Sequence, residues 1–218
     1  MGKIKNIIFD FDGTLAHTSG LIVATMQKTI KDLGLPFRNE DQIKATIGVR
    51  LEEIPLILWP DLKDVSERFA AGYRKNFEVL KYEIPITLFP HVKETLLKLK
   101  NDGYKLAIAT SRSHRSAEDL ATRLGIKDYF LYLLGGNDVA CGKPDPESIF
   151  TILEKMDWNP NETMMVGDMP VDMLMGKNAG VMTCSVTYGN GKLQELKDAD
   201  FIITSFDQLP QILNREEA

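Results

Sequence analysis

The stretch that decides the fold of this 218-residue chain is Ile7-Ile8-Phe9-Asp10-Phe11-Asp12-Gly13-Thr14-Leu15. Its apolar start is typical of a strand buried in a parallel sheet, where helices cover both faces. Two carboxylates follow at i and i+2, so strand alternation places Asp10 and Asp12 on one side while Phe11 points away. Neighbouring carboxylates repel one another unless a cation or a shared proton lies between them. The pattern therefore indicates a site for a metal and a reacting group, with ordinary turn acids as the alternative.

Composition limits the kind of protein this is. The chain is 44% hydrophobic and 26% charged, with a net charge of −5, which is ordinary for a globular protein of one large or two small domains. An acidic balance without a basic stripe argues against a nucleic-acid partner. We expect no membrane span, because no apolar stretch is long enough, and the chain starts without an apolar signal segment. Cys141 and Cys184 do not resemble a disulfide framework, so we expect a cytoplasmic protein.

The segment after the first strand is expected to be helical. Apolar residues recur at helical spacing over residues 22–33 and again over 62–77, and Trp59 and Phe69 fit the interior of such a helical unit. No strand pattern is found from residue 15 to residue 81, and an extended segment, 83–90, follows.

From residue 90 onward, strands and helices alternate. Strands are expected at 105–109, 131–134, 163–166, 182–186 and 201–204, with a helix before or after each and a last helix near 209–213. Such alternation predicts an α/β fold with a doubly wound, Rossmann-like parallel sheet. The first strand cannot be buried alone, so it must join this sheet. We therefore expect an α/β core domain of residues 1–18 and 85–218, with residues 19–84 inserted as a helical cap domain.

Three further stretches place chemistry-bearing residues where ligands bind in such sheets, beyond the carboxyl ends of the strands. Thr110-Ser111-Arg112-Ser113 offers hydroxyls and amides for an anion. Cys141-Gly142-Lys143-Pro144-Asp145-Pro146 holds a lysine in a loop that two prolines restrict. Gly167-Asp168-Met169-Pro170-Val171-Asp172 supplies two more carboxylates. Each stretch alone has an ordinary explanation, such as a helix cap or a surface lysine.

Together, the carboxylates of these stretches outnumber the single lysine. Such a site favours a hard divalent cation with oxygen ligands, and Mg²⁺ fits this description best. His17, His91 and His114 are scattered along the chain, so the sequence does not indicate zinc.

The four stretches, in this order, resemble the four motifs of the haloacid dehalogenase superfamily of phosphotransferases. The resemblance covers essentially the whole chain, including a helical cap inserted after the first motif. Residues 179–189 are similar to the phosphoglycolate-phosphatase-like branch. One departure is His17, where relatives commonly carry an acid, and it concerns contacts at the cap hinge rather than the catalytic core.

The resemblance implies a role for each motif residue. Asp10 would be the nucleophile that forms an aspartyl-phosphate. Asp12 would act as general acid for the leaving alcohol and then as base for water. Thr110 and the Ser111 amide would hold phosphoryl oxygens, and Lys143 would place a positive charge between nucleophile and phosphate.

The resemblance also implies a metal site and further substrate contacts. Mg²⁺ would be bound by Asp10, by Asp12 through its backbone carbonyl and by Asp168, with Asp172 orienting these groups from behind. The residues expected to contact phosphate or substrate, besides Ser111, are Gly13, Thr14, Arg112 and, from the cap, Arg50. For Arg50 a solvated arginine is the alternative, and His114 and Arg115 either line the entrance or face water.

The sequence thus predicts a Mg²⁺-dependent phosphatase acting on a small phosphorylated metabolite, phosphoglycolate-like or sugar-phosphate-like. A β-phosphoglucomutase-like phosphosugar mutase and an inorganic pyrophosphatase stay open, and a non-catalytic binding protein is a remote alternative. A dehalogenase is disfavoured, because it needs neither an acid at Asp12 nor magnesium. We expect a monomer or weak homodimer whose partner is the metabolite, not a nucleic acid or a membrane.

Overall fold

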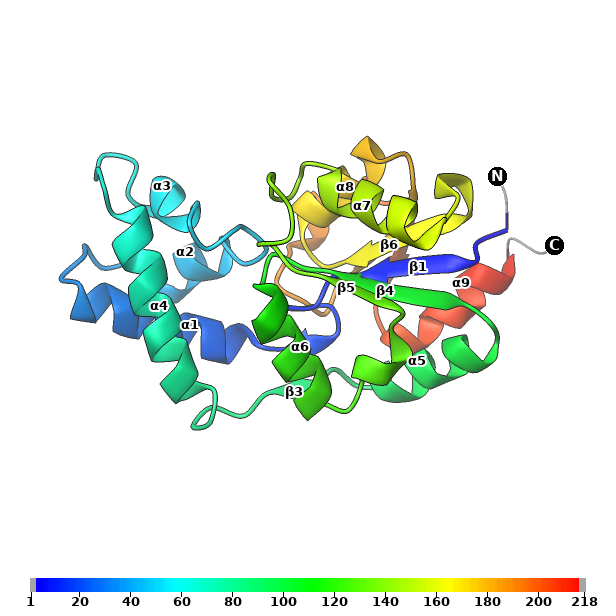
Figure 1. The fold of residues 1–218 in the computed structure, drawn as a ribbon, viewed down its shortest axis with the longest axis horizontal. Helices are drawn as coiled ribbons and strands as arrows, with labels where there is room; N and C mark the ends of the chain where they lie inside the picture. The colour runs from blue at the N-terminus through cyan, green and yellow to red at the C-terminus, as the bar shows by residue number, and fades with distance from the viewer. Residues whose placement is uncertain (1–2, 216–218) are drawn as a thin grey trace.

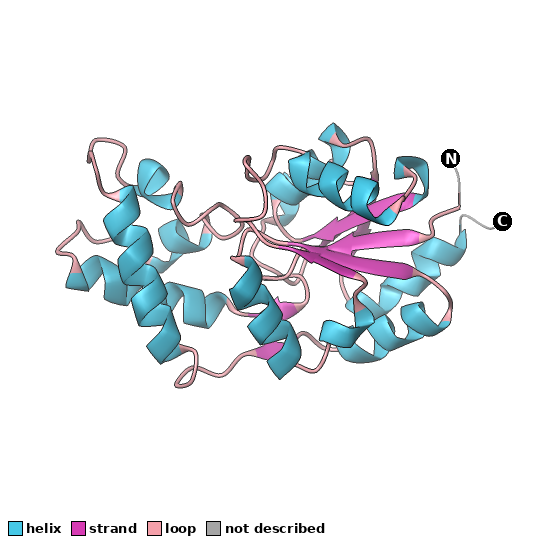
Figure 2. Ribbon diagram, viewed as in Figure 1, coloured by secondary structure: helices cyan, strands magenta, loops and turns pink. Residues whose placement is uncertain are grey.

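The computed structural model describes residues 3–215 and has two lobes, one built on a sheet and one made of helices (Figures 1 and 2). The first lobe contains a six-stranded sheet of order β5-β4-β1-β6-β7-β8, in which all neighbouring strands are parallel. The strands are β1 (Asn6–Phe9), β4 (Lys105–Ala109), β5 (Tyr132–Leu134), β6 (Thr163–Gly167), β7 (Met182–Val186) and β8 (Phe201–Ile203). This sheet confirms the predicted doubly wound α/β fold.

Helices cover both faces of the sheet (Figure 1). α5 (Val92–Asn101), α6 (His114–Arg123) and α9 (Leu209–Arg215) pack on one face, and α7 (Glu147–Met156) and α8 (Pro170–Asn178) pack on the other. Successive side chains of β1 point to opposite faces of the sheet. Ile7 and Phe9 therefore belong to the hydrophobic cluster on the face covered by α5, α6 and α9, and Ile8 belongs to the cluster on the other face. Short 3₁₀ turns occur at Lys127–Tyr129, Pro160–Glu162, Leu193–Glu195 and Phe206–Gln208.

The helical lobe consists of α1 (Ser19–Asp32), α2 (Glu40–Lys44), α3 (Ile54–Leu58) and α4 (Ser66–Leu80). It has a hydrophobic core of its own, in which Trp59 packs edge-on against Phe69. The second long helix was expected to begin near residue 62, but it begins at Ser66, after Asp64 adopts a positive φ of 57°. Within the described residues, no helix is long and apolar enough to cross a membrane.

The two lobes are joined by a two-stranded antiparallel ribbon that the sequence analysis missed. β2 (Ala16–His17) pairs with β3 (Thr87–Leu88), so Ala16 lies opposite Leu88. The expectation of no strand between residues 15 and 81 is therefore wrong, because a strand of two residues is too short to show a periodic pattern. The ring of His17 packs against Phe89 beside this ribbon.

Candidate active site

The site lies where the central strands end, on the side that faces the helical lobe (Figure 1). β1 lies between β4 and β6, so the residues that follow these three strands are neighbours in space. Asp10, Thr110 and Asp168 come from these positions, and all three side chains are buried. The strand order therefore brings together three of the sequence motifs at one edge, as expected for this class of sheet.

Lys143 lies between two carboxylates at the centre of the site. Its Nζ donates hydrogen bonds to Oδ1 of Asp10 at 2.5 Å and to Oδ1 of Asp172 at 2.7 Å. The three side chains are only 1–5% exposed. Burial by itself would lower the pKa of Lys143, but Asp10 and Asp172 outweigh it and hold that pKa above its ordinary value. The lysine is therefore a permanent buried positive charge.

Asp10 and Asp168 are difficult to ionise without a further cation. Burial, opposed by Lys143 and assisted by the neighbouring acids, raises the pKa of Asp10 well above its ordinary value. Burial and then Asp172 raise the pKa of Asp168 to about 7. Ligand atoms of Asp10, Asp168 and Asp172 lie within 4.8 Å of one another. This set of buried carboxylate oxygens, with one ammonium against three acids, suits a hard divalent cation such as Mg²⁺.

Asp168 is oriented by hydrogen bonds from two directions. Its Oδ1 accepts from the Thr14 hydroxyl at 3.0 Å, and its Oδ2 accepts from the backbone and side-chain nitrogens of Asn190 at 2.7 and 3.1 Å. A Cβ at Gly13, whose φ is +92°, would overlap both Asp168 and Asn190. Thr14, which was expected to contact phosphate or substrate, donates to Asp168 in this structure. Sequence reasoning missed Asn190, although it follows strand β7 between two glycines and could have been found by inspecting that strand end too.

The Asp12 side chain contacts the motif after β4. Its carboxylate accepts hydrogen bonds from Arg112 Nη2 at 2.6 Å, from Arg112 Nε at 3.1 Å and from the Thr18 hydroxyl at 2.6 Å. Arg112 was expected to contact phosphate, and in this structure it forms an ion pair with Asp12. The two motifs are therefore linked by a charged pair.

The remaining polar residues after β4 organise the loop and reach the helical lobe. The Thr110 hydroxyl accepts from the backbone N–H of Arg112 at 3.2 Å. The Ser111 hydroxyl donates to the carbonyl oxygen of Gly48 in the helical lobe at 2.6 Å. Arg50, from the same part of that lobe, donates to the carbonyl oxygen of Ala140 at 2.5 Å. The structure thus puts Arg50 at the loop that carries Lys143.

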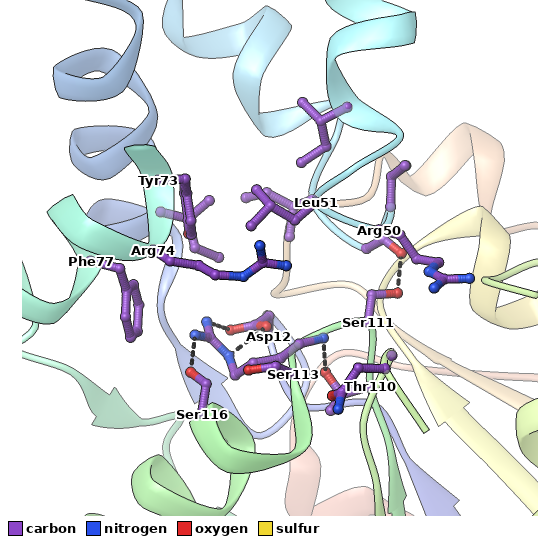
Figure 3. A pocket seen from close by; sticks show the side chains of 18 of the residues that line it. Asp12, Arg50, Leu51, Tyr73, Arg74, Phe77, Thr110, Ser111, Ser113 and Ser116 are labelled. Carbon is purple, nitrogen blue, oxygen red and sulfur yellow. Dashed lines mark hydrogen bonds and ion pairs between the residues drawn. The ribbon is translucent and has the colours of Figure 1, made fainter. Parts of the chain in front are cut away.

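A cavity of about 680 Å³ opens between the lobes, and Asp10, Asp12 and Thr110 line it from the sheet side. Tyr73, Arg74 and Phe77 of α4 face these residues from the helical lobe (Figure 3). Its other apolar lining residues are Ile22, Met26, Ile47, Val49, Leu51 and Ile54. Arg115 also lines the cavity, whereas the ring of His114 is engaged by Asp138 at 2.6 Å. The cavity therefore joins the buried charges to a surface of the helical lobe that is partly apolar and also carries Arg50, Glu52, Arg74, Glu78 and Lys81.

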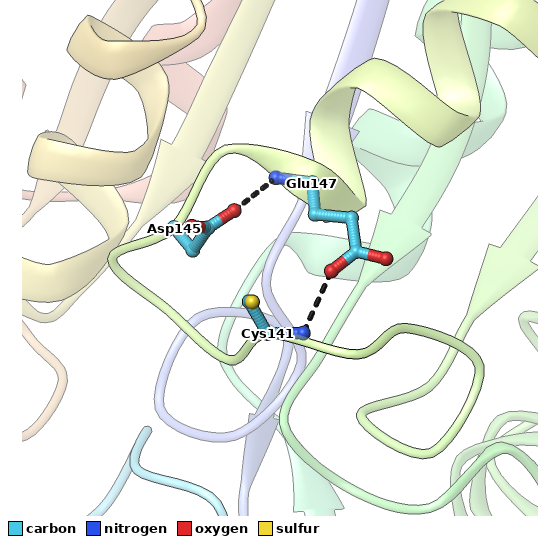
Figure 4. A group of neighbouring side chains, drawn as sticks. All are labelled: Cys141, Asp145 and Glu147. Carbon is cyan, nitrogen blue, oxygen red and sulfur yellow. Dashed lines mark hydrogen bonds between the residues drawn. The ribbon is translucent and has the colours of Figure 1, made fainter.

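A second group of residues of metal-binding types forms hydrogen bonds within a loop (Figure 4). Its members are Cys141, Asp145 and Glu147. Both Glu147 carboxylate oxygens accept backbone hydrogen bonds, from Ala140 at 3.0 Å and Cys141 at 2.6 Å. Asp145 accepts from the backbone N–H of Glu147 at 2.9 Å. These backbone bonds lower the pKa of Glu147. The group closes the loop that presents Lys143, and Cys141 is a free, exposed thiol.

Comparison with known proteins agrees with this geometry. Residues 7–186 match the model of a family described as "Haloacid dehalogenase-like hydrolase". The "Probable phosphatase IndB" of Dickeya dadantii is 37% identical over 210 residues, covering 93% of this chain and 90% of that protein. A phosphoglycolate phosphatase of Vibrio vulnificus is 31% identical, with 97% and 96% covered.

Two further similarities extend this result. The pyrophosphatase PpaX of Oceanobacillus iheyensis is 30% identical, with 92% of this chain and 88% of that protein covered. A solved haloacid dehalogenase-like hydrolase from Streptococcus pneumoniae superposes with a TM-score of 0.85 at 27% identity, covering 97% of this chain and 99% of that chain. These similarities span both lobes, so they concern the whole arrangement and not the sheet alone.

Proposed function

The chain belongs to the haloacid dehalogenase-like hydrolase family, and from this premise we propose that it is a Mg²⁺-dependent phosphatase of a small phosphorylated metabolite. The observation that carries the proposal is the buried Asp10–Lys143–Asp172 arrangement beside Asp168, facing a cavity. A buried ammonium against a carboxylate is the charge pattern that a phosphoryl-transfer site needs, since the incoming phosphate is itself an anion. A cytoplasmic location and a monomeric or weakly dimeric state stay predictions.

The proposed reaction has two steps at Asp10. In the first, an Asp10 oxygen attacks phosphorus, the bond from phosphorus to the alcohol oxygen breaks, and Asp12 gives that oxygen a proton. In the second, water attacks the phosphorus of the aspartyl-phosphate, Asp12 takes a proton from it, and inorganic phosphate leaves Asp10 free again. Thr110 and the amide of Ser111 hold phosphoryl oxygens in both steps.

The metal would be bound by Asp10, Asp168 and the backbone carbonyl of Asp12. Bound there, Mg²⁺ supplies positive charge that offsets repulsion between the phosphate and the attacking carboxylate. Asp172 holds Lys143 through one oxygen and accepts from the backbone N–H of Met169 through the other at 3.0 Å, so it orients the lysine.

We further propose that residues 19–84 act as a cap that selects the substrate over a core of residues 1–18 and 85–218. We expect Arg50, which lines the cavity from the cap side, to bind an anionic group of the substrate. The apolar lining of the cavity on that side favours a substrate with carbon skeleton beyond the phosphate.

A pyrophosphatase is the second candidate, because one relative named as a pyrophosphatase is similar over most of both chains. The two activities differ in their leaving group, which is an alcohol in one and phosphate in the other. A phosphosugar mutase would instead return the phosphoryl group to a sugar.

The experiment is a panel of phosphate monoesters, with pyrophosphate and a sugar phosphate among them, assayed for inorganic phosphate with Mg²⁺ and with excess chelator. We expect release from a small ester only with Mg²⁺, and its loss in Asp10→Asn. Asp157→Asn makes the same chemical change at an exposed residue outside the site, so it should retain full activity. Full activity in chelator contradicts the metal proposal, and substantial turnover by Asp10→Asn contradicts the nucleophile.

A further inference from the structure

The side chain of Arg112 binds Asp12 through the nitrogens that a phosphate ligand would use for phosphate. Its Nε and Nη2 form a two-point contact with the two Asp12 oxygens, at 3.1 and 2.6 Å. Only 7% of the Arg112 side chain and 13% of the Asp12 side chain are exposed. This edge of a guanidinium is the one that matches a carboxylate or a phosphate, and here the carboxylate occupies it.

The other side of the guanidinium is held as well. Nη1 donates to the Ser116 hydroxyl of α6 at 3.1 Å. The centre of the group lies 5.1 Å from the ring of Phe77, on helix α4 of the helical lobe. A cation over an aromatic face is attracted by the ring, more strongly when water is excluded. Arg112 is therefore fixed by the carboxylate, by one core helix and by one cap helix at the same time.

Among the residues that the structure describes, Arg112 is the one cation paired with Asp12. Its other hydrogen bond comes from Thr18, directly before α1, where the chain leaves the sheet lobe. An Asp side chain without partners is free to adopt several χ1 rotamers. The pair with Arg112 restricts that freedom at the edge of the cavity, which both residues line.

We propose that Arg112 is a positioning residue for Asp12, not a ligand of the transferred phosphate, and that Phe77 makes this positioning depend on the place of the cap. The inference rests on the proposed phosphatase activity. If Arg112 turned to a phosphate instead, the half-buried Asp12 side chain would lose the two-point contact that fixes it at the edge of the cavity. We therefore expect Arg112 to affect catalysis by holding the Asp12 side chain in position.

The test compares Arg112→Met in two backgrounds, wild type and Asp12→Ala, with an alkyl and an aryl phosphate as substrates. In wild type we expect kcat/KM for the alkyl phosphate to fall roughly 10- to 100-fold, within the ~10²–10⁴-fold that general acid–base catalysis contributes. The aryl phosphate should lose much less, because a phenolate leaves without a proton. In Asp12→Ala the same change should have no further effect beyond about twofold, since residues that act as one unit are non-additive.

Three controls separate positioning from other roles. Arg112→Lys keeps the charge and should restore part of the alkyl phosphate activity. Inorganic phosphate, used as a competitive inhibitor, should bind Arg112→Met as tightly as wild type. Arg115→Met removes a different cavity-lining arginine. In the part of the chain that the structure describes, the hydrogen-bond partners of the Asp12 side chain are Thr18 and Arg112, so the alkyl-to-aryl ratio of kcat/KM should stay at the wild-type value.

The link to the cap is tested at Phe77. Phe77→Leu keeps an apolar side chain but removes the ring face, so we expect a smaller, several-fold loss confined to the alkyl phosphate. Phe77→Tyr keeps the ring and should retain most of the wild-type ratio.

The outcomes that overturn the inference are distinct. Weaker inhibition by inorganic phosphate, with equal loss on both esters, would make Arg112 a phosphate ligand. An equal loss that lysine does not rescue, accompanied by a lower melting temperature, would make it a structural residue only. A wild-type protein that releases phosphate from neither ester with Mg²⁺ overturns the proposed function, and this inference with it.

Discussion

At the scale of single residues, the site is a balance between carboxylates and one ammonium. Asp10 and Asp172 share Lys143, whose exposure is 2%. A buried charge that loses its partner destabilises a protein by about 3–5 kcal/mol, so the three side chains depend on one another. Asp10, Lys143 and Asp172 are therefore buried as a group, unlike ordinary charged residues, which lie at the surface.

Asp12→Ala is the prediction that belongs to this scale. Loss of the acid should reduce kcat/KM for an alkyl phosphate by roughly 10²–10⁴-fold. An aryl phosphate should still phosphorylate Asp10, but the aspartyl-phosphate then lacks a base for its hydrolysis. Stopped-flow absorbance should show a burst of phenolate close to the enzyme concentration, followed by slow turnover.

The control for this prediction is Thr18→Val, which keeps the Asp12 carboxylate and removes one of its hydrogen bonds. It should retain steady turnover without a burst. If Asp12→Ala stays within a few-fold of wild type on both esters, Asp12 is not the acid–base group.

At the scale of elements, short turns after the strands decide which atoms meet. The turn after β1 needs Gly13, because its φ is +92° and because Asp168 and Asn190 occupy the space of a Cβ. The loop that carries Lys143 is closed by Glu147 at the start of α7. The strands themselves are ordinary buried strands, so the specific chemistry depends on these connections.

Gly13→Ala tests the turn, and Gly34→Ala is its matched control. Both residues have a positive φ, +92° and +63°, but a Cβ at Gly34 would meet nothing within 4 Å. Left-handed backbone costs a non-glycine residue about 1–3 kcal/mol, so both variants should unfold at lower urea concentration. Gly13→Ala should lose more stability, and Mg²⁺ should raise its melting temperature less than that of wild type, because Asp168 is displaced.

Two results would contradict this account of the turn. One is an equal loss of stability in the two variants. The other is an unchanged response of Gly13→Ala to Mg²⁺.

At the scale of the whole molecule, the site exists only because two lobes meet. The β2–β3 ribbon, the Ser111 bond to Gly48 and the Arg112 contact with Phe77 all cross between them. The buried acids Asp10 and Asp168 are unfavourable to ionise, and the proposed Mg²⁺ would offset that cost. Stability of the whole chain is therefore linked to pH and to metal.

We predict that the metal-free protein becomes less stable as pH rises from 3.8 to about 7. The pKa of Asp168, about 7 when folded, lies above its ordinary value of 3.8. Its contribution to stability is thus present at low pH and is lost as pH rises through about 7. The pKa of Asp10 is raised in the same direction. Between its ordinary pKa and its raised folded pKa, each such group lowers the free energy of unfolding by up to about 1.4 kcal/mol per pH unit, and above the folded pKa its slope vanishes.

Urea unfolding at several pH values, with chelator and with Mg²⁺, checks this prediction. Mg²⁺ binds the ionised carboxylates and should flatten or reverse the slope. Asp168→Asn should flatten the slope in chelator, whereas the exposed Asp157→Asn should keep it. A wild-type slope in chelator that matches the Asp168→Asn slope would sink the prediction.

Several features of the molecule follow from the sequence alone. Alternating apolar runs and helical spacing were enough to predict the strands of the sheet and their parallel direction. The motifs after β1, β4 and β6 were enough to assign the family. These features are local, because the pattern of apolar residues that predicts a buried strand or helix face involves residues near one another in the chain.

Only the tertiary structure decided the pairings across the site. Arg112 and Asp12 are separated by 100 positions, and Thr14 and Asp168 by 154. Both Arg112 and Thr14 were expected at the phosphate, and their observed partners depend on how the strands are ordered and where α4 packs. Asn190 and the β2–β3 ribbon were missed for the same reason. Local patterns determine which elements form, whereas contacts between distant side chains depend on how those elements pack.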